Sequence, residues 1–156
     1  MTSLVRAAVV TAALLSLVVV AGCGGDTKAS NNYVDAINKV QTDFANNVQK
    51  AGSSPSTGSD AAAAAKKTFA DLQTAIDKVI ADLQGVKPPD KVKALHAKLI
   101  SEMQEFNKEV QTAGDSLSSG NPQKILAAQS KFASDASNLG TKIGTTISDI
   151  NDKLHS

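Results

Sequence analysis

Four blocks of apolar residues at helical spacing most constrain how this chain can fold. Within each block apolar side chains recur every three or four residues, which places them on one face of an α-helix. Loop-forming residues separate the blocks: residues 51–59 (AGSSPSTGS), Pro88-Pro89 and Gly120-Asn121-Pro122. None of the blocks has the alternating pattern of a β-strand, so the sequence predicts an all-α protein.

We expect helices over about residues 32–50, 60–84, 89–117 and 122–154. Short connections between long helices favour antiparallel neighbours, so the predicted fold is an up-down-up-down four-helix bundle. Asp60 and Asn121 are the predicted N-caps of the second and fourth helices, and Gly85 is the predicted C′ residue of the second. The first helix is the shortest, so apolar residues near the far ends of the others are expected to be less covered: Val110, Leu117, Ile125 and Leu126.

The first 25 residues have the pattern of a secretory signal. A short segment with one positive charge, Arg6, precedes a stretch without charged residues from Ala7 to Gly25. Val20-Ala21-Gly22-Cys23 ends its apolar part and contains the only cysteine of the chain. These four residues resemble the lipobox of bacterial lipoproteins. The resemblance implies that residues 1–22 are a signal peptide that is removed and that the Cys23 thiol receives a diacylglycerol group.

An uncleaved signal anchor and a plain secreted protein are the two alternatives to lipidation, since 19 uncharged residues can just span a bilayer of about 30 Å. Lipidation is favoured because the cysteine stands at the end of the apolar segment. Acyl chains on Cys23 would hold the protein at the extracytoplasmic face of the cell membrane. Residues 23–31 are then the lipidated cysteine and a polar tether, GGDTKASN, with a reach of ~28 Å, and residues 32–156 form the bundle.

The part after Cys23 also resembles small helical lipoproteins of unknown function from actinobacteria. The resemblance rests on Tyr33-Val34 with Phe44 eleven residues on, and on Pro88-Pro89 followed by Leu95-His96 and Leu99. It implies a helical domain and no particular activity.

The charge balance excludes one class of partner. The chain has 16 basic and 15 acidic side chains, and removal of Arg6 with the signal leaves 15 of each. Nucleic-acid-binding proteins show a basic excess, so no nucleic acid is expected as a partner. A lysine cluster opens the third helix (Lys87, Lys91, Lys93 and Lys98), and we expect it to form a solvated, salt-bridged face with Asp82 and Asp90 nearby. Attraction to anionic lipid headgroups is the alternative.

Each predicted helix has one phenylalanine on its apolar face: Phe44, Phe69, Phe106 and Phe132. The rise of an α-helix places them at similar heights, so the sequence predicts one aromatic layer in the bundle. A filled core is the favoured interpretation of this layer. The alternative is an apolar pocket for a lipid or other hydrophobic molecule.

Residues suited to catalysis or metal binding are few. His96 lies at the edge of an apolar face, where a hydrogen-bonded packing role is expected, and His155 is expected to be exposed near the end of the last helix. The three glutamates, Glu102, Glu105 and Glu109, share one side of the third helix and indicate a solvated charged face. Because the sequence has no paired Glu-x-x-His motifs, Cys-His set or phosphate loop, we expect no enzyme, metal or cofactor.

Small residues stand at Ala136, Gly140 and Gly144, a spacing that lets a neighbouring helix approach closely. Close packing within the bundle is the favoured interpretation, and the docking face of a partner is the alternative. Taken together with the predicted lipid anchor and the lack of catalytic motifs, the sequence predicts a non-enzymatic interaction module that binds a protein partner in the cell envelope. A binding protein for a hydrophobic small molecule, using the aromatic layer, is the alternative.

Overall fold

The computed structural model describes residues 27–52, 61–117 and 121–156. Four long α-helices account for most of them: α2 (Thr27–Gly52), α3 (Ala61–Gly85), α4 (Lys93–Leu117) and α5 (Pro122–His155). A short 3₁₀-helix, η1 (Asp90–Val92), precedes α4. No strand occurs in these described ranges, and the predicted all-α class is confirmed.

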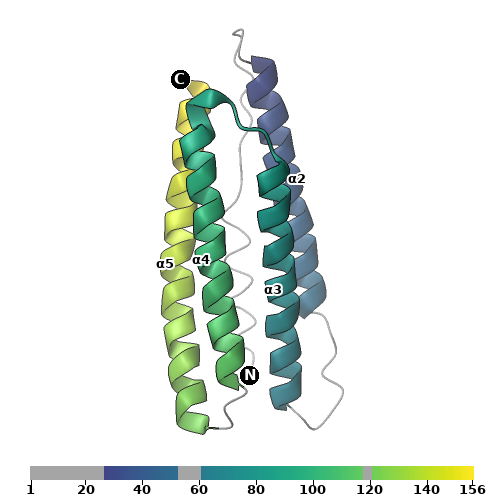
Figure 1. Ribbon diagram of the computed structural model, residues 1–156, viewed down its shortest axis with the longest axis vertical. Coiled ribbons are helices and arrows are strands. Elements are labelled where there is room, and N and C mark those ends of the chain that lie inside the picture. The colour runs from purple at the N-terminus through teal and green to yellow at the C-terminus, as the bar shows by residue number, and fades with distance from the viewer. Residues whose placement is uncertain (1–26, 53–60, 118–120) are drawn as a thin grey trace.

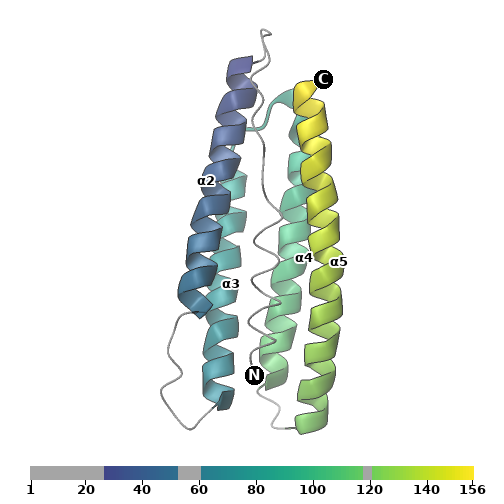
Figure 2. The same cartoon turned by 180° about the vertical axis from the view of Figure 1, so that it is seen from behind.

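The helices lie side by side as a helical bundle (Figure 1). Close packing follows the order of the chain, with α2 on α3, α3 on α4 and α4 on α5. The first and last of these helices, α2 and α5, are on the same side of the molecule (Figure 2) but are not a closely packed pair.

The two ends of the bundle are built from different segments. The start of α2, the α3–α4 connection and the end of α5 lie together at one end (Figure 1), which we call the His96 end (residues 27–33, 83–96 and 151–156). Lys91 at this end donates a hydrogen bond to the carbonyl oxygen of Leu154, at 3.0 Å, and η1 packs on α5. The start of α3, the end of α4 and the start of α5 lie at the opposite end, which we call the Leu126 end (residues 61–69, 110–117 and 121–132).

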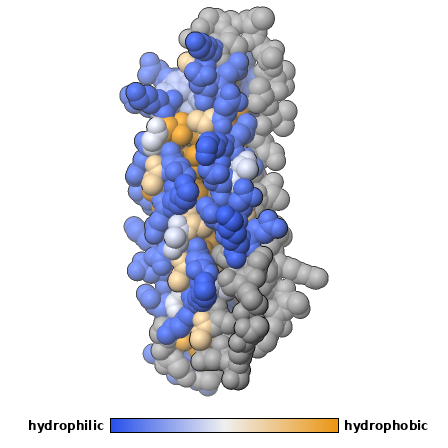
Figure 3. Space-filling model, turned by 90° about the vertical axis from the view of Figure 1, so that its right-hand side faces the viewer, coloured by the Kyte–Doolittle hydropathy of each residue, from blue (hydrophilic) through white to orange (hydrophobic). Residues whose placement is uncertain are grey.

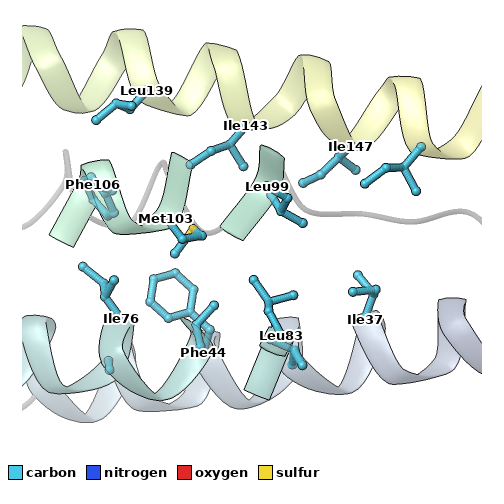
Figure 4. Packing of buried hydrophobic residues seen from close by; sticks show 14 of the residues in the cluster. Ile37, Phe44, Ile76, Leu83, Leu99, Met103, Phe106, Leu139, Ile143 and Ile147 are labelled. Atoms are coloured by element: carbon cyan, nitrogen blue, oxygen red, sulfur yellow. The ribbon is translucent and has the colours of Figure 1, made fainter. Parts of the chain in front are cut away.

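Apolar side chains from all four helices form the core. Figure 4 shows residues of different helices pointing toward one another across the bundle, such as Ile143 of α5, Met103 of α4 and Phe44 of α2. The most deeply buried of the large core side chains are Tyr33, Ile76, Val92 and Val110. Packing of these apolar faces, rather than intrinsic helix propensity, is what stabilises helices of this kind.

The helix boundaries agree with the prediction to within two residues, except at the starts of α2 and α4. That helix begins at Thr27, so residues 27–31, predicted as part of the tether, are helical. Ser30 and Tyr33 lie on the buried face one turn apart, and their packing extends the helix toward the N-terminus. The third predicted helix begins later, because the segment after Pro88-Pro89 first forms η1.

One predicted helix signal is confirmed, one is wrong and one lies outside the described residues. Asn121 caps α5, and its side-chain oxygen accepts hydrogen bonds from the backbone N–H groups of Gln123 at 3.0 Å and Lys124 at 3.2 Å. Gly85 is the last residue of α3 and lacks the positive φ of a C′ glycine; the Val86 N–H closes the turn on the Leu83 carbonyl. Asp60 belongs to the segment that the structure leaves undescribed.

The outer surface is largely polar. From the side of α2 and α3, hydrophilic residues predominate and apolar surface is confined to a narrow seam (Figure 3). Among the described residues, no helix is long and apolar enough to cross a membrane.

Candidate functional site

The predicted lipidation site, Cys23, lies outside the described residues, but the start of α2 limits its distance from the bundle. Cys23 and Thr27 are four residues apart in the chain. Four extended residues span at most ~14 Å, half the predicted reach of the tether. A lipid on Cys23 would therefore hold the His96 end of the bundle directly beside the membrane.

A buried polar network joins three helices at the His96 end. The Tyr33 hydroxyl of α2 lies 3.1 Å from Nδ1 of His96 on α4, and Nε2 of His96 lies 3.0 Å from the backbone carbonyl oxygen of Leu83 on α3. A carbonyl oxygen can only accept, so Nε2 carries the proton and Nδ1 accepts the hydrogen bond from Tyr33. The two rings also pack edge to face, with centroids 5.6 Å apart. The predicted packing role of His96, with a hydrogen-bond partner, is confirmed.

Burial shifts the protonation equilibria of both rings in this network. Desolvation lowers the pKa of His96, although its hydrogen bond to the Leu83 carbonyl acts in the opposite direction. Desolvation also raises the pKa of Tyr33 to about 12. Both groups are therefore neutral near pH 7, and the network is suited to fastening α2, α3 and α4 together. His155 is exposed, as predicted, and its Nδ1 donates to the Asn151 carbonyl at 2.6 Å.

Three of the four phenylalanines in the predicted aromatic layer meet. The ring centroid of Phe132 lies 5.4 Å from that of Phe69, edge to face, and 6.4 Å from that of Phe106 in a stacked arrangement. Phe44 is buried but stands apart from this set and points toward Met103 (Figure 4). The three rings in contact fill space against one another, as expected of side chains in a packed core.

Glu102 is not on a solvated face as predicted, because it points toward α5. Its side chain is 8% exposed, and its Oε1 accepts a hydrogen bond from Thr146 Oγ1 at 3.0 Å. Lys98 Nζ is 3.8 Å from the same oxygen, whereas Oε2 is buried without a hydrogen-bond partner. The other two glutamates fit the prediction better: Glu105 is exposed beside Lys142, and Glu109 pairs with Lys131.

An open groove of about 510 Å³ lies next to Glu102, between α4 and α5. Its lining is polar: Lys98, Ser101, Glu102, Glu105, Thr141, Lys142 and Thr145. Each lysine of this lining pairs with a glutamate of the same lining, at 3.8 Å for Lys98 and 3.5 Å for Lys142. The charges of the groove thus compensate one another, and none of the four phenylalanines lines it.

Six lysines along the bundle are paired with carboxylates. Lys39, Lys67 and Lys78 each contact the aspartate one helical turn further on, at 2.5–2.7 Å. Asp82 therefore forms its ion pair with Lys78 of its own helix. The predicted salt-bridged face at the start of α4 is consequently wrong except at Lys98: within the described part of the chain, Lys87, Lys91 and Lys93 form no ion pair, and Lys91 donates to a backbone carbonyl.

The small residues of α5 do not make the predicted close helix contact at Gly144, where a Cβ atom would have nothing within 4 Å. The close approach occurs at a different glycine, Gly114 of α4. A Cβ atom there would lie 3.4 Å from the Cβ of Phe69 on α3. A glycine within a sequence of mixed polarity gives no signal of such a contact.

The Leu126 end leaves apolar side chains uncovered. Leu126 is 65% exposed, and Leu117, Ile125 and Phe132 are partly exposed. Val110 was also expected to be less covered, but it is fully buried because α4 lies between α3 and α5.

No group of three or more histidine, cysteine, aspartate or glutamate side chains suited to a metal ion occurs among the residues that the structure describes. Comparisons with protein-family models, with curated proteins and with solved structures find no match to this chain.

Proposed function

We propose that this protein is a lipid-anchored lipoprotein of the extracytoplasmic face of the cell membrane. Its domain is an antiparallel up-down-up-down four-helix bundle that acts as a non-enzymatic interaction module of the cell envelope. The observation that carries the proposal is the position of Cys23: the only cysteine ends an apolar segment and stands four residues before the first described helix.

The anchor gives the bundle a direction. Attachment at Cys23 would place the His96 end at the membrane, because the covalent reach to Thr27 is at most ~14 Å. The 34 residues of α5 span about 50 Å, so the Leu126 end would project that far from the membrane surface. The end that projects is also the one with uncovered apolar side chains.

A surface around Leu126 fits a protein partner. Single exposed apolar residues are common on protein surfaces, but here Ile125 and Phe132, which share a neighbouring face of the same helix, are also partly exposed. The contacts among Phe69, Phe106 and Phe132 favour this interaction role over a ligand pocket lined by those rings.

Photo-crosslinking in cells tests the interaction role. A photoreactive residue at Leu126 is expected to give a discrete crosslinked protein, and the same residue at exposed Ser148 of α5 serves as the matched control. Cys23→Ser is expected to release the protein from the membrane fraction and to abolish the crosslink. Equal crosslinking from both positions, or none from Leu126, would contradict an interaction surface at this end.

A further inference from the structure

The His96 end carries an excess of positive charge. Its described side chains include five lysines, namely Lys28, Lys87, Lys91, Lys93 and Lys153, against two aspartates, Asp90 and Asp152. Asp26, outside the described residues, adds one acidic group nearby in sequence. The opposite end also has more lysines than carboxylates, with Lys66, Lys67, Lys124 and Lys131 against Asp115. What distinguishes the His96 end is that α2 begins there, four residues after Cys23.

The lysines of the His96 end form no ion pair with another described residue. Lys28, Lys87, Lys93 and Lys153 are exposed, and Lys91 donates a hydrogen bond to the Leu154 carbonyl. Six lysines elsewhere on the bundle do form ion pairs, and four do not. Lys28 and Lys93 stand in the first turns of α2 and α4, where the helix dipole disfavours a positive charge, whereas it favours Lys153 in the last turn of α5. Helix stability therefore gives no reason for Lys28 and Lys93.

The segments that carry these lysines lie at one end of the bundle (Figure 1). Lys28 is about 7.5 Å along α2 from Tyr33, and Lys93 is about 4.5 Å along α4 from His96, the residue that Tyr33 contacts. The connection with Lys87 and the end of α5 with Lys153 are at the same end (Figure 1). These offsets are smaller than a Debye length of about 8 Å at physiological ionic strength.

We propose that the five-lysine His96 end binds the anionic lipid headgroups of the membrane that carries the anchor and so holds the bundle upright. This inference rests on the proposed lipid anchor at Cys23. A reach of at most ~14 Å from Cys23 to Thr27 exceeds the headgroup layer, which is about 5–8 Å thick on each side of a bilayer, by about one Debye length. The anchor then brings the lysines within the range of headgroup phosphates, where attraction to each basic side chain is appreciable.

Lysine footprinting of the lipidated full-length protein tests the proposal without mutation. The protein is reconstituted in vesicles of neutral phosphatidylcholine or of phosphatidylcholine with phosphatidylglycerol, and an uncharged amine-reactive reagent is followed by peptide mass spectrometry. We expect Lys28, Lys87, Lys93 and Lys153 to react roughly two- to five-fold more slowly on the anionic vesicles, and 0.5 M salt to abolish the difference. Equal rates on both vesicles, or protection of lysines at the Leu126 end instead, would overturn the proposal.

A pair of matched variants tests the orientation itself. Lys28, Lys87, Lys93 and Lys153 are changed together to Gln in one variant; the control changes the four other exposed lysines without a described ion pair, Lys50, Lys66, Lys108 and Lys124. Ser156→Cys provides a thiol for a fluorophore, and energy transfer to a headgroup-labelled lipid reports the height of the His96 end.

In the wild type and the control, the labelled His96 end is expected to lie closer to the surface of anionic vesicles than to that of neutral vesicles. In the variant with four lysines of the His96 end changed to Gln, the two heights are expected to be equal. The same difference in height in all three proteins would overturn the headgroup contact. Failure of the wild type to float with neutral vesicles, or dye labelling of Cys23, would instead refute the proposed anchor.

Discussion

The two ends of this bundle are built in different ways. At the His96 end, Tyr33 and Val92 are almost completely buried and a hydrogen-bonded network joins α2, α3 and α4. At the Leu126 end, Phe69 and Phe132 are only partly covered and Leu126 is 65% exposed. A well-packed end beside the proposed anchor and a less covered end away from it fit the proposed interaction module. The difference predicts unequal responses to substitution.

Truncation of one aromatic residue at each end should give the largest contrast. Tyr33→Ala is expected to lower the free energy of unfolding by about 3–5 kcal/mol, because it leaves a large cavity and an unpaired His96 nitrogen. Phe132→Ala should cost about 1–3 kcal/mol, since that ring is already partly exposed. Urea unfolding followed by circular dichroism measures both. A larger loss for Phe132→Ala would reverse the comparison.

Removal of the Tyr33 hydroxyl separates the contribution of the hydrogen bond to His96 from the contribution of ring packing. Tyr33→Phe keeps the ring but leaves Nδ1 of His96 without a donor, at an expected cost of about 1–3 kcal/mol. Adding His96→Leu should recover part of that loss, because the Leu83 carbonyl still accepts a hydrogen bond from the Val86 N–H. The unfolding free energies of Tyr33→Phe, His96→Leu and the double variant are compared. If the effects of the two single changes add in the double variant, the two side chains act independently and the network contributes nothing.

Acid should weaken the His96 end selectively. The pKa of His96 is lowered in the folded protein, so below about pH 6.5 the unfolded chain binds a proton at this residue that the folded chain does not. The free energy of unfolding is therefore expected to fall as the pH drops from about 6.5 toward the folded pKa, by at most about 1.4 kcal/mol per pH unit.

Unfolding titrations between pH 5 and 8 measure this slope. The Tyr33→Phe/His96→Leu double variant is the control and should lose this component. An unchanged slope in the control would assign the acid sensitivity to other groups.

The smallest effect on stability is expected at the opposite end. Leu126→Ser should change the free energy of unfolding by no more than about 0.5 kcal/mol, because the side chain is mostly exposed. The same variant should still reduce partner capture if this end is the interaction surface. A loss of 2 kcal/mol or more in urea unfolding would mean that Leu126 belongs to the core.

Helical periodicity was sufficient to predict the all-α class and most helix ends, because an apolar face is a local pattern. The Asn121 cap was predictable for the same reason, since its partners are two and three residues away. The start of α2 was not, because the packing of Ser30 and Tyr33, rather than the local sequence, extends that helix.

Contacts between distant residues account for the other differences. Tyr33 and His96 are 63 residues apart, and Glu102 and Thr146 are 44 apart, so no spacing rule brings either pair together. The sequence predicts Asp82 as a neighbour of the lysines in the α3–α4 connection, but Lys78 is one helical turn from Asp82 and pairs with it. The predicted pairing failed because a within-helix partner was available.

Mass spectrometry of the protein extracted from membranes tests the central claim most directly. The account predicts a chain that begins at Cys23, lacks residues 1–22 and carries diacylglycerol on that cysteine, and a Cys23→Ser variant that carries no lipid. A membrane-extracted protein that retains residues 1–22 with a free Cys23 thiol would contradict it.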